Sequence, residues 1–232
     1  MRIPRLQASF GCVALACSVL LTTSAVAQER RPPGFVDAAE VVDGLLVDMR
    51  YFGSDNFIGT RVNGYEAPRC LLTLQAAKAL AAVQHDLSAR GLGVKVFDCY
   101  RPLRAVAHFV RWARNVADVK RKAEFYPQVD KRDVFALGYV SMQSGHARGS
   151  TVDVTLVTRP GGAELDMGTP FDFFSPRSHA DAPGITTAQR ANRRLLADAM
   201  RRRGFLSYRK EWWHFVLRNE PFPATSFDFP VR

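Results

Sequence analysis

Residues 144–157 read SGHARGSTVDVTLV, a glycine-rich turn followed by a run of apolar and β-branched residues. Glycines flank His146 in the turn, and the run from Val152 to Val157 has the composition of a buried strand. This stretch predicts a strand that enters the core directly after a turn. His146 is expected in the turn and Asp153 at the beginning of the strand.

Further strands and helices are predicted on either side of this stretch. Runs rich in valine, leucine and aromatic residues predict strands at Gly44 to Tyr51, Val94 to Tyr100 and Trp213 to Leu217. Helical spacing of apolar residues predicts helices after Thr73, from Pro102, and from Thr187 to Arg203. In the last helix we expect an inward face of Ala188, Ala191, Leu195 and Ala199.

The order of these elements predicts the fold class. Helices and strands come in blocks, without regular β-α-β alternation, which favours an α+β domain with a mostly antiparallel sheet covered by helices. The 232 residues, 47% of them hydrophobic, suffice for one sizeable core and are too few for two ordinary domains. A single domain is therefore expected, and disorder is excluded.

The first 27 residues have the pattern of a secretory signal peptide. Arg2 and Arg5 precede an uncharged apolar run, and Ala25-Val26-Ala27 has the small-residue spacing that signal peptidases recognise. We expect cleavage after Ala27 and a folded domain over residues 28–232, without stable membrane insertion. The alternative is a lipoprotein cleavage box that would place a lipid on Cys17.

The exported part is basic. Removal of two arginines from a chain with 32 basic and 22 acidic residues leaves a net charge of +8. Basic runs at residues 120–122 and 201–203 attract polyanions in general. Because export is expected, anionic cell-wall material is a nearer partner than nucleic acid. The alternative is a solvated surface that keeps the protein soluble.

Two cysteines remain after cleavage, Cys70 and Cys99. A pair of cysteines in an oxidising compartment predicts one disulfide. A catalytic thiol is a weaker alternative, because Cys99 lies in an apolar run without a histidine beside it. Metal ligation by the pair alone lacks the usual close spacing.

His146, Asp153 and His214 fit a metal site. A catalytic zinc ion takes three protein ligands, and imidazole nitrogen and carboxylate oxygen match its preferences. Glu211, three residues before His214, is placed to accept the proton of an attacking water. Residues three apart in a strand point to opposite faces, so Glu211 must precede the strand or lie at a bulge.

Arg101 is a further candidate for the site, and the remaining histidines and tryptophans are not. Arg101 follows a predicted buried strand and precedes Pro102, which would hold its guanidinium rigidly toward an oxyanion or carboxylate, with Asp98 orienting it; a surface charge is the alternative. The aperiodic stretch from Thr158 to Gly184 is a candidate substrate-binding rim. Ordinary structural roles are expected for His85, His108, His179, Trp212 and Trp213.

Five segments together resemble the VanX-type D-alanyl-D-alanine dipeptidases. These are zinc peptidases related to the D,D-carboxypeptidases, and they share their fold with the hedgehog signalling domain. The matching segments are residues 55–59, 100–102, 144–153, 165–172 and 211–214. Their order is that of the family, and the resemblance covers nearly the whole exported chain.

The resemblance implies a role for each matched residue. His146, Asp153 and His214 match the zinc ligands, Glu211 the catalytic base, and Arg101 the arginine that stabilises the oxyanion. By the same match Asp172 meets the substrate ammonium group, with Asp166 as the competing acid, and Ser144 helps to hold the dipeptide.

The implied activity is hydrolysis of D-alanyl-D-alanine in the periplasm with one zinc ion per chain, in turnover of cell-wall fragments. One alternative is a D,D- or L,D-carboxypeptidase that acts on longer peptidoglycan stems. Another is a non-catalytic zinc-bearing wall-binding module, which has no need of a general base at Glu211. The paired cysteines and the export signal are not general features of the cytoplasmic members of this family that act in glycopeptide resistance. The resemblance therefore does not imply a role in resistance.

Overall fold

A five-stranded sheet lies at the centre of the protein. The computed structural model describes residues 30–232, so the predicted signal peptide, its cleavage after Ala27 and the alternative at Cys17 lie outside the described residues. The strand order is β2-β4-β5-β7-β6. Their bounds are Leu46–Val47 (β2), Leu92–Asp98 (β4), Thr151–Thr158 (β5), His214–Leu217 (β7) and Phe205–Ser207 (β6).

Most neighbours in this sheet are antiparallel. Antiparallel pairing joins β4 to β5, β5 to β7 and β7 to β6, whereas β2 runs parallel to β4. A second, antiparallel sheet pairs β1 (Phe35–Asp37) with β3 (Leu71–Thr73). The predicted α+β fold with a mostly antiparallel sheet is confirmed.

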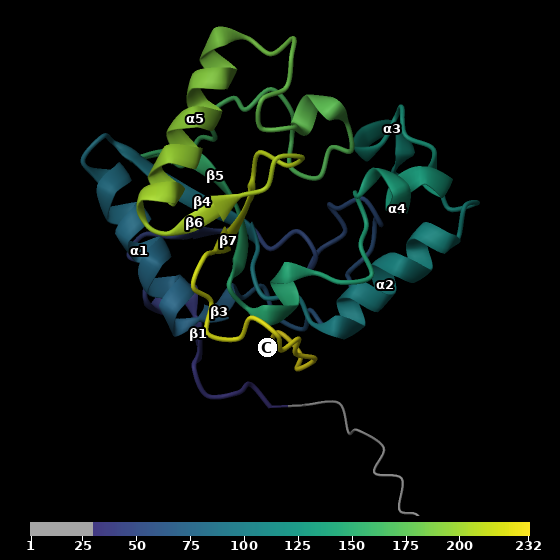
Figure 1. Cartoon of the computed structure of the whole chain (residues 1–232), viewed down its shortest axis with the longest axis horizontal. Helices are drawn as coiled ribbons and strands as arrows, with labels where there is room; N and C mark the ends of the chain where they lie inside the picture. The colour runs from purple at the N-terminus through teal and green to yellow at the C-terminus, as the bar shows by residue number, and fades with distance from the viewer. Residues whose placement is uncertain (1–29) are drawn as a thin grey trace, which may run out of the picture.

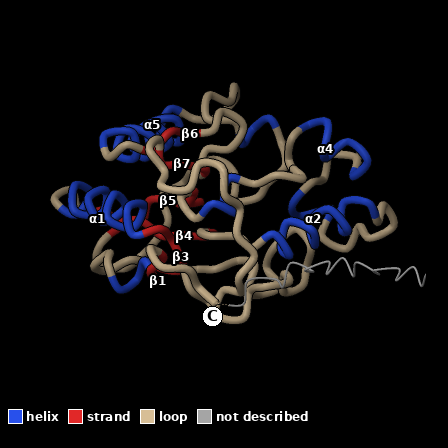
Figure 2. The backbone as a smooth tube through the Cα atoms, turned by 60° about the horizontal axis from the view of Figure 1, so that its bottom comes forward, coloured by secondary structure: helices blue, strands red, loops and turns tan. Residues whose placement is uncertain are grey.

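Helices flank the central sheet on two sides (Figures 1 and 2). α1 (Leu74–Ser88) and α5 (Thr187–Arg202) pack on one side of it. Opposite them lie α2 (Leu103–Arg114), α3 (Lys122–Phe125) and α4 (Val134–Leu137). Short 3-10 turns complete the chain at Ala38–Glu40, Lys131–Asp133, Gly145–Arg148 and Pro176–Ser178.

The three long helices begin where their sequences favour it. The Thr73 side chain accepts a hydrogen bond from the Ala76 amide and so caps α1. Thr186 caps α5, and Gln189 completes a reciprocal capping box. Pro102 stands at the N-cap of α2, one residue before the first turn expected for it.

The predicted inward face of α5 is confirmed at Ala199, which is buried, and at Leu195, which packs against the core, and it is wrong at its first two residues. Ala188 and Ala191 are exposed, whereas Arg193, at 3% exposure, belongs to the buried face. The Arg193 guanidinium donates hydrogen bonds to the carbonyl oxygens of Met167, Arg177 and His179. A buried arginine that binds loop carbonyls breaks the apolar pattern on which the prediction relied.

The strand predicted over Gly44 to Tyr51 is only two residues long in the structure. Leu46 and Val47 pair with β4 at the edge of the sheet, and both side chains are exposed. Beyond them the amides of Asp48 and Arg50 still donate to carbonyl oxygens of β4, but the chain turns away. A short edge strand limits pairing with other chains.

The core packs between the sheet and the helices, and the disulfide lies inside it. Cys70 and Cys99 form the predicted bond, and both residues are fully buried.

Within residues 30–232, no helix combines the length and apolar composition needed to cross a bilayer.

Candidate active site

Three strands bring acidic and imidazole side chains to one level of the sheet. The register pairs Asp98 of β4 with Asp153 of β5, and Asp153 with His214 of β7. Side chains paired directly across strands project from the same face. A bulge between Val96 and Asp98 places Asp98, instead of Phe97, opposite Asp153. The bulge therefore joins Asp98 to the cluster.

The turn before β5 supplies His146. Its 3-10 turn is capped by the Ser144 hydroxyl, which accepts a hydrogen bond from the His146 amide. Gly149 ends the turn at a positive φ of 76°, and a Cβ there would collide with the Phe35 ring. Glycine is required because both the backbone angle and the contact exclude a side chain.

The donor atoms of His146, Asp153 and His214 face one another. His146 Nε2 lies 3.3 Å from both His214 Nδ1 and Asp153 Oδ2. His214 Nδ1 lies 3.1 Å from Asp153 Oδ1. Ligands at zinc-binding distances in a tetrahedron lie about 3.3 Å apart. These spacings therefore fit three ligands of one zinc ion.

The surroundings of these atoms also fit a cation. His146 Nδ1 donates a hydrogen bond to the Cys99 carbonyl at 2.7 Å, so the lone pair of Nε2 faces the cluster. Asp153 is 2% exposed, and its buried Oδ1 accepts no hydrogen bond from the described residues. Unsatisfied buried acceptors beside two imidazoles are the pattern that a metal ion completes.

Glu211 lies in the turn just before β7, as its predicted geometry required. Its Oε2 is 3.5 Å from His214 Nδ1, at the edge of the cluster. Burial raises the pKa of Glu211 to about 7, although the charge of His214 opposes the shift. A carboxyl group with a pKa near neutrality can both accept and return a proton.

Arg101 extends from the end of β4 toward the same cluster. Its Nε and Nη2 donate to Asp98 Oδ2 at 2.9 and 2.8 Å, and Nη2 lies 3.9 Å from Asp153 Oδ2. The guanidinium also lies over the rings of Tyr51 and Phe109. Ion pairing and ring contacts hold it rigidly, as expected for a group that stabilises an oxyanion.

Asp172 approaches the cavity from the loop after β5. It has a positive φ of 59°, and its carboxylate accepts a hydrogen bond from the Tyr51 hydroxyl at 2.8 Å. Burial raises the pKa of Asp172 well above its usual value. The competing acid, Asp166, is exposed and bonds to the Gly168 amide and to Gln189, away from the cavity.

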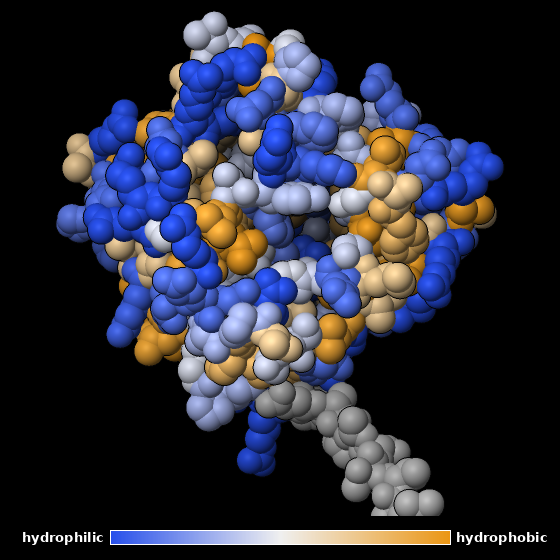
Figure 3. Space-filling view, viewed as in Figure 1, coloured by the Kyte–Doolittle hydropathy of each residue, from blue (hydrophilic) through white to orange (hydrophobic). Residues whose placement is uncertain are grey.

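These side chains line one cavity of about 290 Å³. One wall is the segment from Gly138 to His146, which includes Ser144, and another is formed by Tyr208, Glu211 and Trp213. The stretch from Thr158 to Gly184, predicted as a rim, contributes Asp172. The molecular surface is hollowed between the two helical sides of the protein (Figure 3).

The other histidines stay apart from this cluster. Among residues 30–232, the group that can hold a metal ion is His146, Asp153 and His214. The side chain of His85 is solvent-exposed, and His108 Nδ1 accepts a hydrogen bond from the Asn63 amide. Trp212 and Trp213 are buried, and Trp213 also lines the cavity.

The sequence analysis missed two tyrosines. Tyr51 binds Asp172, and the Tyr65 hydroxyl donates to Asp98 Oδ1 at 2.5 Å. Both tyrosines are 1% exposed. Nothing in their sequence surroundings distinguishes them from ordinary core tyrosines, because their partners lie more than 30 residues away.

The chain is similar in sequence to known D-alanyl-D-alanine dipeptidases. D-alanyl-D-alanine dipeptidases of Enterococcus faecium and Streptomyces coelicolor are 41% and 43% identical to the chain. The alignments cover 86% and 85% of this chain and 98% and 96% of those proteins.

Similar solved structures are more distant. A vancomycin-resistance D,D-pentapeptidase VanY in complex with Zn(II) is 16% identical, with a TM-score of 0.40 over 75% of this chain and 86% of that one. The LdcB LD-carboxypeptidase is also 16% identical, with a TM-score of 0.40 over 83% of this chain and 71% of that one.

The chain also matches the model of a whole protein family. The D-ala-D-ala dipeptidase model of the M15 peptidases matches residues 31–232, nearly all of the described chain. With this match and the identities above, the chain belongs to the D-Ala-D-Ala dipeptidase family of the M15 peptidases.

Proposed function

We propose that this protein is a zinc-dependent dipeptidase that hydrolyses D-alanyl-D-alanine to two molecules of D-alanine. The observation that carries the proposal is the convergence of His146, Asp153 and His214 beside Glu211 in one buried cavity. The curated relatives, named D-alanyl-D-alanine dipeptidases, support the choice of substrate.

His146 Nε2, His214 Nδ1 and a carboxylate oxygen of Asp153 would hold one zinc ion per chain. When bound, zinc polarises a carbonyl group and lowers the pKa of water toward neutrality. Asp153 is suited to this role because, although burial opposes ionisation, the two imidazoles hold its pKa well below the ordinary value. The cluster thus already stabilises the charged form of a ligand.

Glu211 moves the proton in this mechanism. Its carboxylate accepts a proton from the attacking water and delivers it to the nitrogen of the departing D-alanine. A pKa of about 7 leaves a large fraction of Glu211 deprotonated at neutral pH and still makes it a competent acid. Its position beside His214 keeps the transfer short.

Arg101 and Asp172 act at the two ends of the substrate. The guanidinium of Arg101 faces the carbonyl oxygen as it becomes negative, and Asp98 keeps it in place. Asp172 takes the ammonium group of the dipeptide, which supplies the counter-charge that its buried carboxylate lacks. Ser144, on the cavity wall, helps to hold the dipeptide.

The cavity favours a short substrate. Its volume of about 290 Å³ is at the small end of ligand pockets, which suits a dipeptide better than a peptidoglycan stem. The alternative is a D,D- or L,D-carboxypeptidase that acts on longer stems. Incubation with the free dipeptide and with a pentapeptide stem separates the two, since alanine release from the stem alone would reject a dipeptidase.

We further propose that the protein is exported to the periplasm and acts on cell-wall fragments. Two observations support this: the signal-peptide pattern over residues 1–27 and the disulfide, which is typical of oxidising compartments. The basic surface is suited to anionic wall material.

A combined metal and activity assay tests the proposed function. Purified protein is analysed for bound zinc and assayed for D-alanyl-D-alanine hydrolysis before and after chelation. Activity should require zinc and return when zinc is added back; a metal-free preparation that is fully active would reject the mechanism. A Glu211→Gln variant that binds zinc and cleaves at the wild-type rate would reject Glu211 as the general base. A zinc-loaded wild-type protein that cleaves no peptide would favour the non-catalytic wall-binding module.

A further inference from the structure

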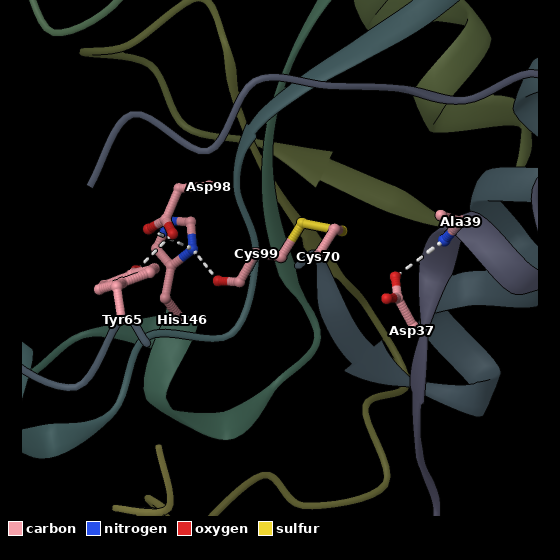
Figure 4. The surroundings of a disulfide bond; sticks show 7 residues. All are labelled: Asp37, Ala39, Tyr65, Cys70, Asp98, Cys99 and His146. Atoms are coloured by element: carbon pink, nitrogen blue, oxygen red, sulfur yellow. Dashed lines mark hydrogen bonds and ion pairs between the residues drawn. A yellow bond between two sulfur atoms is a disulfide. The ribbon is translucent and has the colours of Figure 1, made fainter. Parts of the chain in front are cut away.

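We propose that the Cys70–Cys99 disulfide is a positioning element of the metal site, through the hydrogen bond that the Cys99 carbonyl accepts from His146. This inference rests on the proposed metal site and adds Cys70 and Cys99 to the residues that position its ligands. Figure 4 shows the disulfide on one side of the chain at Cys99 and the His146 imidazole on the other. Both cysteines are fully buried and 29 residues apart.

The segment from Asp98 to Arg101 holds His146 at three points. The Cys99 carbonyl accepts from His146 Nδ1 at 2.7 Å, and Asp98 Oδ2 lies 3.4 Å from the same nitrogen. The Arg101 amide donates to the His146 carbonyl at 3.2 Å. These contacts set the tautomer and the direction of the ring, so a shift of this segment would turn Nε2 away from Asp153 and His214.

The sheet alone does not hold this segment. The β4–β5 pairing is irregular after Val96, and β4 ends at Asp98, so Cys99 lies outside the ladder. On the far side, the Tyr100 amide donates to the Leu71 carbonyl at 2.9 Å. The disulfide adds a covalent tie between Cys99 and the residue just before β3, at the point where regular pairing stops.

Cys70 is itself well anchored. Its carbonyl accepts from the Ala38 amide at 2.7 Å, and β3 pairs with β1 over three residues. The tie therefore runs from a fixed strand pair, through the sulfurs, to the carbonyl that orients a metal ligand. Reduction of the bond should weaken zinc binding more than a comparable loss of packing elsewhere.

The test compares zinc affinity in two destabilised variants. Cys70→Ala/Cys99→Val removes the bond and keeps the site apolar, so no buried hydroxyl is left unpaired. The control, Leu196→Ala, removes a fully buried side chain from α5, on the side of the sheet away from the cavity. Zinc affinity is measured by chelator competition, and the absorption spectrum of the cobalt-substituted proteins reports ligand geometry.

The cysteine variant should bind zinc about 10- to 100-fold more weakly, the range seen for lost outer-shell contacts. Its cobalt spectrum should change, and its activity at limiting zinc should recover in excess zinc. The Leu196→Ala variant should keep wild-type affinity and spectrum. Equal zinc affinity in wild type and cysteine variant would overturn the inference, as would a cysteine variant that does not fold, because the bond would then be a requirement of the fold.

The outcome is separable from that of the proposed function. A wild-type protein that binds no zinc would contradict the proposed function itself. A wild-type protein that binds zinc and cleaves the dipeptide, together with an unaffected cysteine variant, would contradict this inference alone.

Discussion

The two ends of the cavity each hold a buried aspartate, and the two residues respond to burial in opposite ways. At the sheet end, the imidazoles of His146 and His214 hold the pKa of Asp153 well below its ordinary value, despite burial. At the loop end, burial raises the pKa of Asp172 well above its usual value, and a hydrogen bond from Tyr51 offsets only part of the rise.

Burial raises the pKa of both carboxyl groups, so the difference comes from their neighbours, which outweigh burial at Asp153 and not at Asp172. His146 and His214 stabilise the anion of Asp153, whereas Asp172 needs a positively charged partner to stay ionised. The sheet end is thus complete in the protein itself apart from a metal ion. The loop end becomes complete only when a positively charged group of a ligand arrives. The predictions below test this contrast, beginning with the largest expected effect.

Replacement of Asp153 by asparagine should abolish activity. The amide keeps the shape of the side chain but removes the negative charge between the two imidazoles. We expect loss of stoichiometric zinc and hydrolysis of D-alanyl-D-alanine at the limit of detection. Metal analysis and a turnover assay check this. A variant that keeps both zinc and activity would show that Asp153 is not a ligand.

Glu211→Gln should lower kcat by about 10²- to 10⁴-fold, the usual contribution of a general base. Zinc content should stay at the wild-type level, because the sheet end is intact. In the wild type, kcat/KM should fall toward acid pH, since protonation of Glu211 removes the base. A flat pH profile between pH 5 and 8, or loss of zinc in the variant, would contradict this role.

Arg101→Ala should lower kcat by about 10²- to 10³-fold, the range for loss of one oxyanion donor. Zinc binding should change little, because the guanidinium contacts Asp98 and lies 3.9 Å from Asp153. Arg101→Lys is the matched control, since it keeps the charge without the two-point hydrogen bond to Asp98. Full activity of the alanine variant would exclude a role for Arg101 at the oxyanion.

Asp172→Asn should act on binding at the loop end. Loss of the counter-charge for the ammonium group should raise KM about 10- to 100-fold, with a smaller change in kcat, since hydrogen bonds to charged groups contribute about 1.5–3 kcal/mol. Asp166→Asn is the matched control, because Asp166 is exposed and outside the cavity. An equal effect of both variants would remove Asp172 from substrate binding.

The last prediction concerns stability and does not involve activity. In metal-depleted protein, Glu211 has a pKa of about 7 when folded, against an ordinary value of 4.5. The folded state then binds more protons than the unfolded state between these values, so the free energy of unfolding should decrease as the pH rises through this window. The expected decrease is on the order of 3 kcal/mol.

Urea titrations at pH 4.5 and 8 measure this change in wild type and in Glu211→Gln. The variant lacks the titrating group and should show less of the decrease. An equal decrease in the free energy of unfolding in both proteins would mean that folding does not raise the pKa of Glu211.

The local patterns of the sequence predicted most of the fold. Thr73 and the residues around Pro102 mark helix beginnings by rules of capping and backbone geometry that act within a few residues. Strand periodicity left two positions for Glu211, before the strand or at a bulge, and the structure has the first of them. The predicted face of α5 was wrong in its first half, because Arg193 is buried against carbonyl groups of a distant loop, which no local pattern reveals.

The sequence by itself determined which chemistry is available: two histidines, one of them in a glycine-rich turn, an aspartate and a glutamate, and a single cysteine pair after the predicted cleavage site. Tertiary structure decided which groups meet. The register of three strands and one bulge place Asp98, Asp153 and His214 together, and folding buries Tyr51 beside Asp172. The physical reason is that donor distances and pKa values depend on neighbours contributed by remote segments, which only the packed chain brings within a few ångströms.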